Sequence, residues 1–94
     1  MSQTASDSIV KSAFQVTFEF YGRLGKLANQ PEISLPIQTP MTLEQALKQL
    51  AEVKPDLSEN LERCACAIGD ELVSRTMLLQ ANTRVALLPP VAGG

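Results

Sequence analysis

Histidine and tryptophan are absent from this sequence, and cysteine occurs only twice. Imidazole is the usual general base that activates a serine or cysteine nucleophile, so a hydrolase that is complete within this chain is not expected. A structural zinc site needs about four nitrogen or sulfur ligands, and two thiols without histidine do not supply them. We therefore expect no catalysis and no metal binding by this chain alone.

Basic clusters and long apolar runs are also missing. Among 94 residues, eight Lys and Arg stand against ten Asp and Glu, which gives a formal net charge of -2. No stretch of the sequence contains enough clustered Lys and Arg to neutralise a row of phosphates, so a nucleic acid partner is not expected. The polar first residues lack the basic start and apolar run of a secretory signal, and no segment reaches the roughly 18 apolar residues of a membrane span. These features favour a cytoplasmic protein with no membrane partner.

The two cysteines lie two residues apart, in the stretch RCACAIG. In a strand this spacing would place Cys64 and Cys66 on the same face. It differs from the CxxC spacing of redox pairs. Free cysteine is among the most often buried residue types, so we predict reduced thiols that line the core.

Two strands are predicted near the start of the chain. FQVTFEFY at residues 14–21 alternates apolar and polar residues, as a strand with one buried face does. EISLPI at residues 32–37 offers a second, shorter strand, and the two could pair as a hairpin. Between them, GRLGKLANQP contains two glycines and a proline and indicates a loop or a loose turn of helix.

A helix is predicted to begin after Thr42. Gln45 follows three residues later, and this pair forms the capping-box pattern, in which each side chain satisfies a free backbone N–H. Pro55 ends the helix because its ring pushes Lys54 out of the helical region. The apolar stripe of this helix comprises Leu43, Ala46, Leu47 and Leu50.

The C-terminal half contains further short strands. They are predicted in CACAIG, in ELV after a Gly69-Asp70 turn, and in TRVALL at residues 83–88. A helix that follows a hairpin and precedes further strands must cover one face of a single mixed sheet. The ubiquitin-like β-grasp fold has this arrangement, although other small α+β layouts share the same order of elements. We predict an α+β fold with a mixed sheet of four to five strands packed on one main helix, in residues 13–88. A flexible leader would precede it at residues 1–12, and an extended C-terminal tail would follow it at residues 89–94.

The sequence ends on LLPPVAGG. Pro89 and Pro90 have a fixed φ and lack N–H donors, so they end the last strand and hold the chain extended. Gly93 and Gly94 have no Cβ, so an enclosing active site could grip their backbone closely. The terminal carboxylate gains a good leaving group if another enzyme converts it to an acyl-adenylate. Residues 89–94 span at most about 20 Å when extended, which is enough to enter a neighbouring subunit. The alternative is an inert, loose end.

These segments resemble the MoaD group of the MoaD/ThiS sulfur-carrier family. The resemblance rests on VALLPPVAGG at the C-terminus, VTFEFYGRLGKL, ISLPIQTPMTLEQALKQL and CAIGDELV, and it covers roughly residues 13–94. It implies a β-grasp subunit of a heterotetrameric molybdopterin synthase, with no cofactor bound by the subunit itself. A MoeB-like enzyme would adenylate Gly94 with ATP, and a sulfur donor such as a cysteine desulfurase or a rhodanese would convert the adenylate into a thiocarboxylate. The tail would then enter a MoaE-like large subunit and supply sulfur to cyclic pyranopterin monophosphate in molybdenum cofactor biosynthesis.

The same resemblance implies the site residues. Gly94 would carry the acyl-adenylate and the thiocarboxylate. The partner would be bound by Leu88, Pro89, Pro90, Val91, Ala92 and Gly93, although Leu88 could equally be the edge of the domain's own core.

The chain departs from the family at two places near its end. Many members have Gly-Asp at a hairpin before the last strand and an aromatic residue before the prolines, where this chain has ANTR and Leu88. Asn82 can adopt the left-handed conformation that glycine would supply, so we expect the hairpin to be kept.

Other functions remain open from the sequence. ThiS-like donors to thiazole synthesis or to tRNA thiolation use the same terminal chemistry, although the Pro-Pro-Val-Ala stretch favours the molybdopterin branch. A ubiquitin-like modifier would instead pass its activated glycine to a lysine. A plain interaction module would make no use of the terminal glycines.

Overall fold

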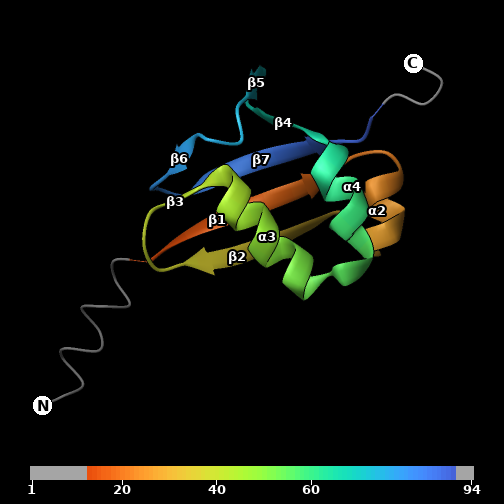
Figure 1. The fold of residues 1–94 in the computed structure, drawn as a ribbon, viewed down its shortest axis with the longest axis horizontal. Helices are drawn as coiled ribbons and strands as arrows, with labels where there is room; N and C mark the ends of the chain where they lie inside the picture. Colours follow the sequence, from red (N-terminus) through yellow and green to blue (C-terminus); the bar gives the residue numbers. More distant parts are fainter. Residues whose placement is uncertain (1–12, 91–94) are drawn as a thin grey trace, which may run out of the picture.

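The structure is a computed structural model that describes residues 13–90 (Figure 1). The predicted leader at residues 1–12 and the last four residues of the tail lie outside this range. No helix within the described range is long and apolar enough to cross a membrane.

A five-stranded mixed sheet forms one layer of the fold, with the strand order β2-β1-β7-β4-β5. The strands are β1 Phe14–Phe20, β2 Glu32–Ile37, β4 Ala65–Ile68, β5 Glu71–Val73 and β7 Thr83–Leu88. β1 and β2 form the predicted antiparallel hairpin, while β7 lies parallel to β1 and antiparallel to β4. The last strand of the chain is therefore the central strand of the sheet.

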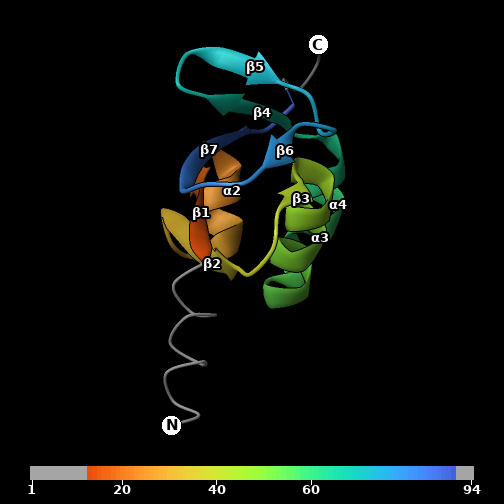
Figure 2. The ribbon, with the colours of Figure 1, turned by 90° about the vertical axis from the view of Figure 1, so that its left-hand side faces the viewer.

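Three helices cover one face of this sheet (Figures 1 and 2). They are α2 Arg23–Ala28, α3 Leu43–Val53 and α4 Ser58–Arg63, with a 3₁₀ turn, η1 Pro55–Leu57, between the last two. No helix of residues 13–90 lies on the opposite face, so the described domain has two layers. We call this uncovered side the open face.

The start and end of α3 are those that the sequence predicts. The Thr42 N–H donates to Gln45 Oε1 at 2.9 Å, and the Gln45 N–H donates to Thr42 Oγ1 at 3.2 Å. The capping box is therefore confirmed. Lys54 has φ -131° and lies outside the helix, directly before Pro55.

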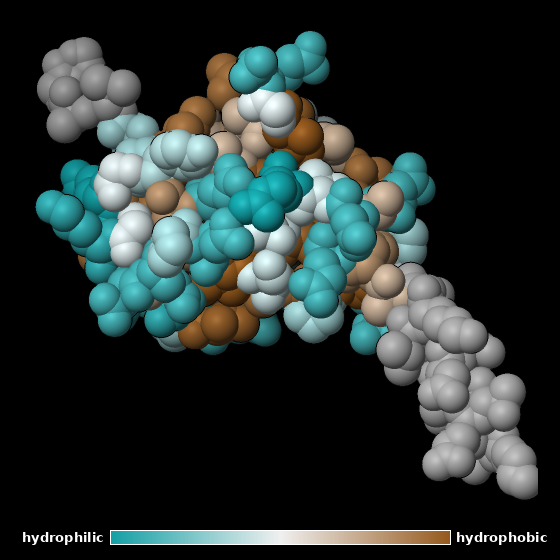
Figure 3. All heavy atoms as spheres, turned by 180° about the vertical axis from the view of Figure 1, so that it is seen from behind, coloured by the Kyte–Doolittle hydropathy of each residue, from teal (hydrophilic) through white to brown (hydrophobic). Residues whose placement is uncertain are grey.

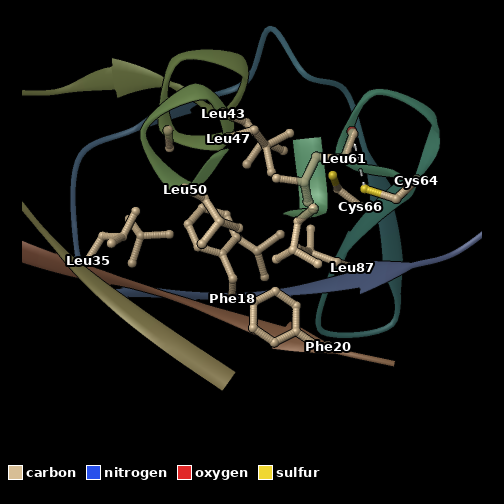
Figure 4. Packing of buried hydrophobic residues seen from close by; sticks show 14 of the residues in the cluster. Phe18, Phe20, Leu35, Leu43, Leu47, Leu50, Leu61, Cys64, Cys66 and Leu87 are labelled. Atoms are coloured by element: carbon tan, nitrogen blue, oxygen red, sulfur yellow. Dashed lines mark hydrogen bonds between the residues drawn. The ribbon is translucent and has the colours of Figure 1, made fainter. Parts of the chain in front are cut away.

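The core lies between α3 and the sheet (Figure 4). Leu43 and Leu50 of α3 and Phe18 of β1 are fully buried, as is Leu87 of β7. Cys64 and Cys66 are free and buried in the same cluster, which confirms that they line the core as reduced thiols. Cys64 directly precedes β4, so only Cys66 lies within the strand.

The structure contains elements beyond the predicted sheet and its one main helix, because α2 and α4 also pack on the sheet. Residues 56–63 contain α4, which the sequence does not indicate. Only Leu57 and Leu61 of this stretch are buried, and two apolar residues are too few to form a recognisable helical pattern. The connection before the last strand contains β6 Leu78–Leu79, which pairs with β3 Met41–Thr42 in a separate two-stranded sheet.

The predicted left-handed turn at Asn82 is wrong. Among the described non-glycine residues, only Asn29 has a positive φ. Because β6 pairs with β3, no tight hairpin connects it to β7. Asn82 Oδ1 instead accepts a hydrogen bond of 2.8 Å from the Gln15 backbone N–H, which holds the entry to β7 beside the start of β1.

Candidate functional site

The start of the tail is attached to the sheet on both sides. Leu87 lies opposite Phe20 of β1, and Leu88 lies opposite Ala65 of β4. Just beyond β1, the Tyr21 N–H donates to the Leu87 carbonyl oxygen at 3.3 Å. The chain therefore leaves the domain from a point that neighbouring backbone holds in place.

The two prolines follow directly, as the sequence predicts. β7 ends at Leu88, Pro89 is half-buried against the domain and Pro90 is exposed. The other predicted tail residues lie outside the described residues, so their contacts remain predictions; they are Val91, Ala92, Gly93 and Gly94.

Leu88 points away from the main core. Its neighbour Leu87 is fully buried beneath the helices, and successive side chains of a strand lie on opposite faces. The half-buried Leu88 side chain therefore lies on the open face, beside the start of the tail.

Small and apolar residues surround Leu88 on this face. Ala65 lies opposite Leu88, and Ala67 lies opposite both Ala86 of β7 and Leu72 of β5. Leu72 is 72% exposed, which is the highest value among the large apolar residues that the structure describes. Ala67 is only 8% exposed, whereas Ala65 is exposed and Ala86 and Leu88 are half-buried. We call Ala65, Ala67, Leu72, Ala86 and Leu88 the apolar strip. It runs across three adjacent strands next to the start of the tail.

The middle of the open face is mainly polar. Arg84 of β7 forms ion pairs with Glu19 of β1 at 2.8 Å and with Glu32 of β2 at 2.6 Å. These hydrogen bonds to two carboxylates raise the pKa of Arg84. Next to them, the hydroxyl groups of Thr17 and Ser34 are 2.7 Å apart. Figure 3 views this side, with hydrophilic residues over much of its middle and apolar residues towards its upper and lower edges.

The two thiols do not belong to this surface. Cys64 and Cys66 are 4% and 3% exposed and pack beneath the helices. Hydrogen bonding with Cys66, together with the nearby Arg75 guanidinium, lowers the pKa of Cys64 to about 7. The same hydrogen bonding and burial raise the pKa of Cys66. Because the core encloses both sulfur atoms, we assign them a structural role.

The described residues therefore form a fixed attachment point for the tail and, beside it, the apolar strip. Within the described residues there is no group of three or more His, Cys, Asp or Glu side chains that could hold a metal ion. The sequence indicated the start of the tail through its two prolines. It did not indicate the apolar strip, because the strip forms only when β4, β5 and β7 lie side by side.

Two curated proteins are similar to this chain over much of their length. The molybdopterin synthase sulfur carrier subunit of Arabidopsis thaliana is 23% identical over 91 residues, which cover 97% of this chain and 95% of the relative. The protein of the same name from Dictyostelium discoideum is 30% identical over 64 residues, which cover 66% of this chain and 73% of the relative.

Solved structures confirm the predicted ubiquitin-like β-grasp fold. SAMP1 from Haloferax volcanii matches with a TM-score of 0.73 at 20% identity, over 85% of this chain and 99% of that protein. A chain from the complex of subunits 1 and 2 of the molybdopterin-converting factor of Helicobacter pylori matches with a TM-score of 0.60 at 26% identity. That match covers 86% of this chain and 100% of the other.

A family model accounts for most of the sequence. The model is described as the ThiS family, and it matches residues 18–94. The match includes β7 and continues through the two prolines to the last glycine, so it covers both the domain and its tail. This chain therefore belongs to the ThiS family.

Proposed function

We propose that this protein is the sulfur-carrier subunit of molybdopterin synthase and that it acts in the cytoplasm. The observation that carries the proposal is the family match, which extends to Gly94. The matched tail directly follows β7, the central strand of the sheet. The two curated relatives bear this name, which supports the molybdopterin branch over other sulfur-transfer pathways.

The proposed chemistry takes place at the carboxylate of Gly94. A MoeB-like enzyme joins one carboxylate oxygen to the α-phosphate of ATP, and pyrophosphate leaves. Sulfur from a donor such as a persulfide then attacks the acyl carbon, and AMP leaves with that oxygen. A thiol, from a second cysteine of the donor or from a reductant, then attacks the donor's own sulfur in this acyl disulfide, so that a new disulfide forms and Gly94 is released as a thiocarboxylate. Its sulfur then bonds to a carbon of cyclic pyranopterin monophosphate in place of a C–O bond, and water cleaves the acyl C–S bond, which leaves the sulfur on the pterin and returns Gly94 to a carboxylate.

The catalytic groups belong to the partner in this proposal. The sequence contains no histidine, and the described surface beside the tail is apolar. A MoaE-like large subunit would supply the acids, the bases and the pterin-binding groups. The solved complex of subunits 1 and 2 of the Helicobacter pylori factor supports a partner of this kind.

The apolar strip is the surface that we propose for docking. Leu72 and Leu88 would be covered by the large subunit, while the small alanines between them would let the partner approach the strands closely. The strip borders the start of the tail. One contact could therefore hold the domain and direct residues 89–94 into the partner's active site, over at most about 20 Å.

Reconstitution of sulfur transfer tests this proposal. Thiocarboxylated protein would be mixed with the large subunit from the same organism and with cyclic pyranopterin monophosphate. We expect molybdopterin to form while the mass of the carrier returns to that of the carboxylate. The unmodified carboxylate form is the matched control and should yield no product.

Two results would contradict the proposal. One is a carrier that keeps its sulfur in this mixture but delivers it to thiazole synthesis or to tRNA. The other is an activated Gly94 that becomes attached to lysine side chains, which a denaturing gel would reveal as larger conjugates.

A further inference from the structure

Gly22 lies directly beneath the start of the tail. It connects β1 to α2 and has φ 57° and ψ -136°. A Cβ atom built on Gly22 would lie 3.1 Å from Cγ and 3.8 Å from Cδ of Pro89. Apart from the two residues adjacent to Gly22, it would meet no other atom of the described residues within 4 Å. The first residue of the tail therefore rests on a backbone segment without a side chain.

We propose that Gly22 is a positioning residue for the tail, which fixes the direction in which the chain leaves the domain at Pro89. The inference rests on the proposed function, because direction matters only if the tail must enter a partner. Gly22 itself would touch neither substrate nor partner.

Two physical features make glycine necessary at this position. The backbone angles lie in a region that residues with a Cβ rarely adopt. A Cβ would also approach Pro89 more closely than ordinary van der Waals contact allows, so the proline ring would have to move by a few tenths of an ångström. Any larger residue therefore strains the connection to α2 and displaces the first residue of the tail.

The neighbouring backbone leaves little room for relaxation. Tyr21, next to Gly22, donates its N–H to Leu87, two residues before Pro89. The carbonyl groups of Tyr21 and Gly22 accept the first hydrogen bonds of α2, from Leu24 and Gly25, both at 3.2 Å. Gly22 is therefore held between the helix and the sheet, so the displacement falls on Pro89. The fixed φ of Pro89 and Pro90 would carry a change at the first ring into the direction of the following residues.

Single-turnover sulfur transfer tests this role. The thiocarboxylated Gly22→Ala variant would be assayed at increasing concentrations with the large subunit and cyclic pyranopterin monophosphate. We expect the maximal rate to fall about tenfold, because small misplacements of a reacting group are costly. The concentration for half-maximal rate should change less than about twofold, since the apolar strip is intact. A raised half-maximal concentration with an unchanged maximal rate would overturn the inference, because the substitution would then act on the affinity for the large subunit.

Gly69→Ala is the matched control. Gly69 also has a positive φ, 63°, but a Cβ there would meet no atom of the described residues within 4 Å, apart from the two adjacent residues. Both variants should lower the thermal unfolding temperature, but Gly69→Ala should keep the wild-type maximal rate. An equal loss of rate in the two variants would overturn the inference, because backbone strain alone would then explain the effect.

A double variant tests the contact itself. In a Pro89→Ala background the ring atoms are gone, so adding Gly22→Ala should change the maximal rate less than about twofold. A full tenfold loss in that background would overturn the inference. If Gly22→Ala alone does not fold, Pro89→Ala alone should lower the maximal rate about fivefold, and an unchanged rate would overturn it. Failure of the wild-type protein to transfer sulfur would refute the proposed function instead.

Discussion

Truncation of Leu72 to alanine should weaken binding of the large subunit without weakening the fold. A leucine side chain contributes about 1.5–3 kcal/mol when it moves from full exposure to full burial. Leu72 has 72% of its surface still exposed in the isolated domain. Complete burial against a partner would therefore contribute about 1–2 kcal/mol, of which alanine retains a minor part. The dissociation constant should rise roughly five- to tenfold.

Isothermal titration calorimetry with the large subunit measures this change. Leu78→Ala is the matched control, because Leu78 is 50% exposed but lies on β6, outside the apolar strip. Both variants should unfold within a few degrees of the wild type, since neither side chain is part of the core. Equal dissociation constants for wild type, Leu72→Ala and Leu78→Ala would refute the assignment of the strip as the docking surface.

Three further changes test the forces that hold the domain. Leu50→Ala should lower the free energy of unfolding by about 2–5 kcal/mol in urea denaturation, because the Leu50 side chain is fully buried between α3 and the sheet. Thr42→Ala should cost about 1 kcal/mol in the same assay, since it removes the acceptor for the Gln45 N–H, whereas Thr42→Ser should remain near wild type. Arg75→Leu should cost about 1–3 kcal/mol, because Arg75 Nη2 donates to two carbonyl groups at the end of α4. An unchanged midpoint for any of the three would contradict the role given to that residue.

The elements that could be predicted from the sequence are those whose residues carry a local signal. β1 alternates apolar and polar side chains over seven residues, and α3 combines a capping box, an apolar stripe and a terminating proline. In both cases the signal comes from residues of a single helix or strand and the residues that flank it. Tertiary context was not needed to recognise them.

The features that could not be predicted depend on contacts between distant residues. α4 reaches the core mainly through Leu61, and Arg75, more than ten residues further along the chain, supplies donors to its C-terminal end. β3 and β6 are two residues long, and neither carries a pattern of its own. The turn expected at Asn82 fails for the same reason, since β6 pairs with β3 instead of β7.

One part of the candidate site could be predicted from the sequence, and the other part could not. Pro89 and Pro90 indicate the start of the tail by their chemistry alone. The strip around Leu72 and the contact between Gly22 and Pro89 join segments far apart in the sequence, and they become visible only when the strands are placed in order.

The most direct test of the central claim is the intact mass of the protein after incubation with ATP, a MoeB-like enzyme and a sulfide source. Sulfur carriage at Gly94 predicts a gain equal to the replacement of one oxygen atom by one sulfur atom. The gain should disappear when Gly94 is deleted, while the deletion variant keeps the thermal unfolding temperature of the wild type. No gain under conditions that convert a known carrier, or a gain that survives the deletion of Gly94, would contradict the account.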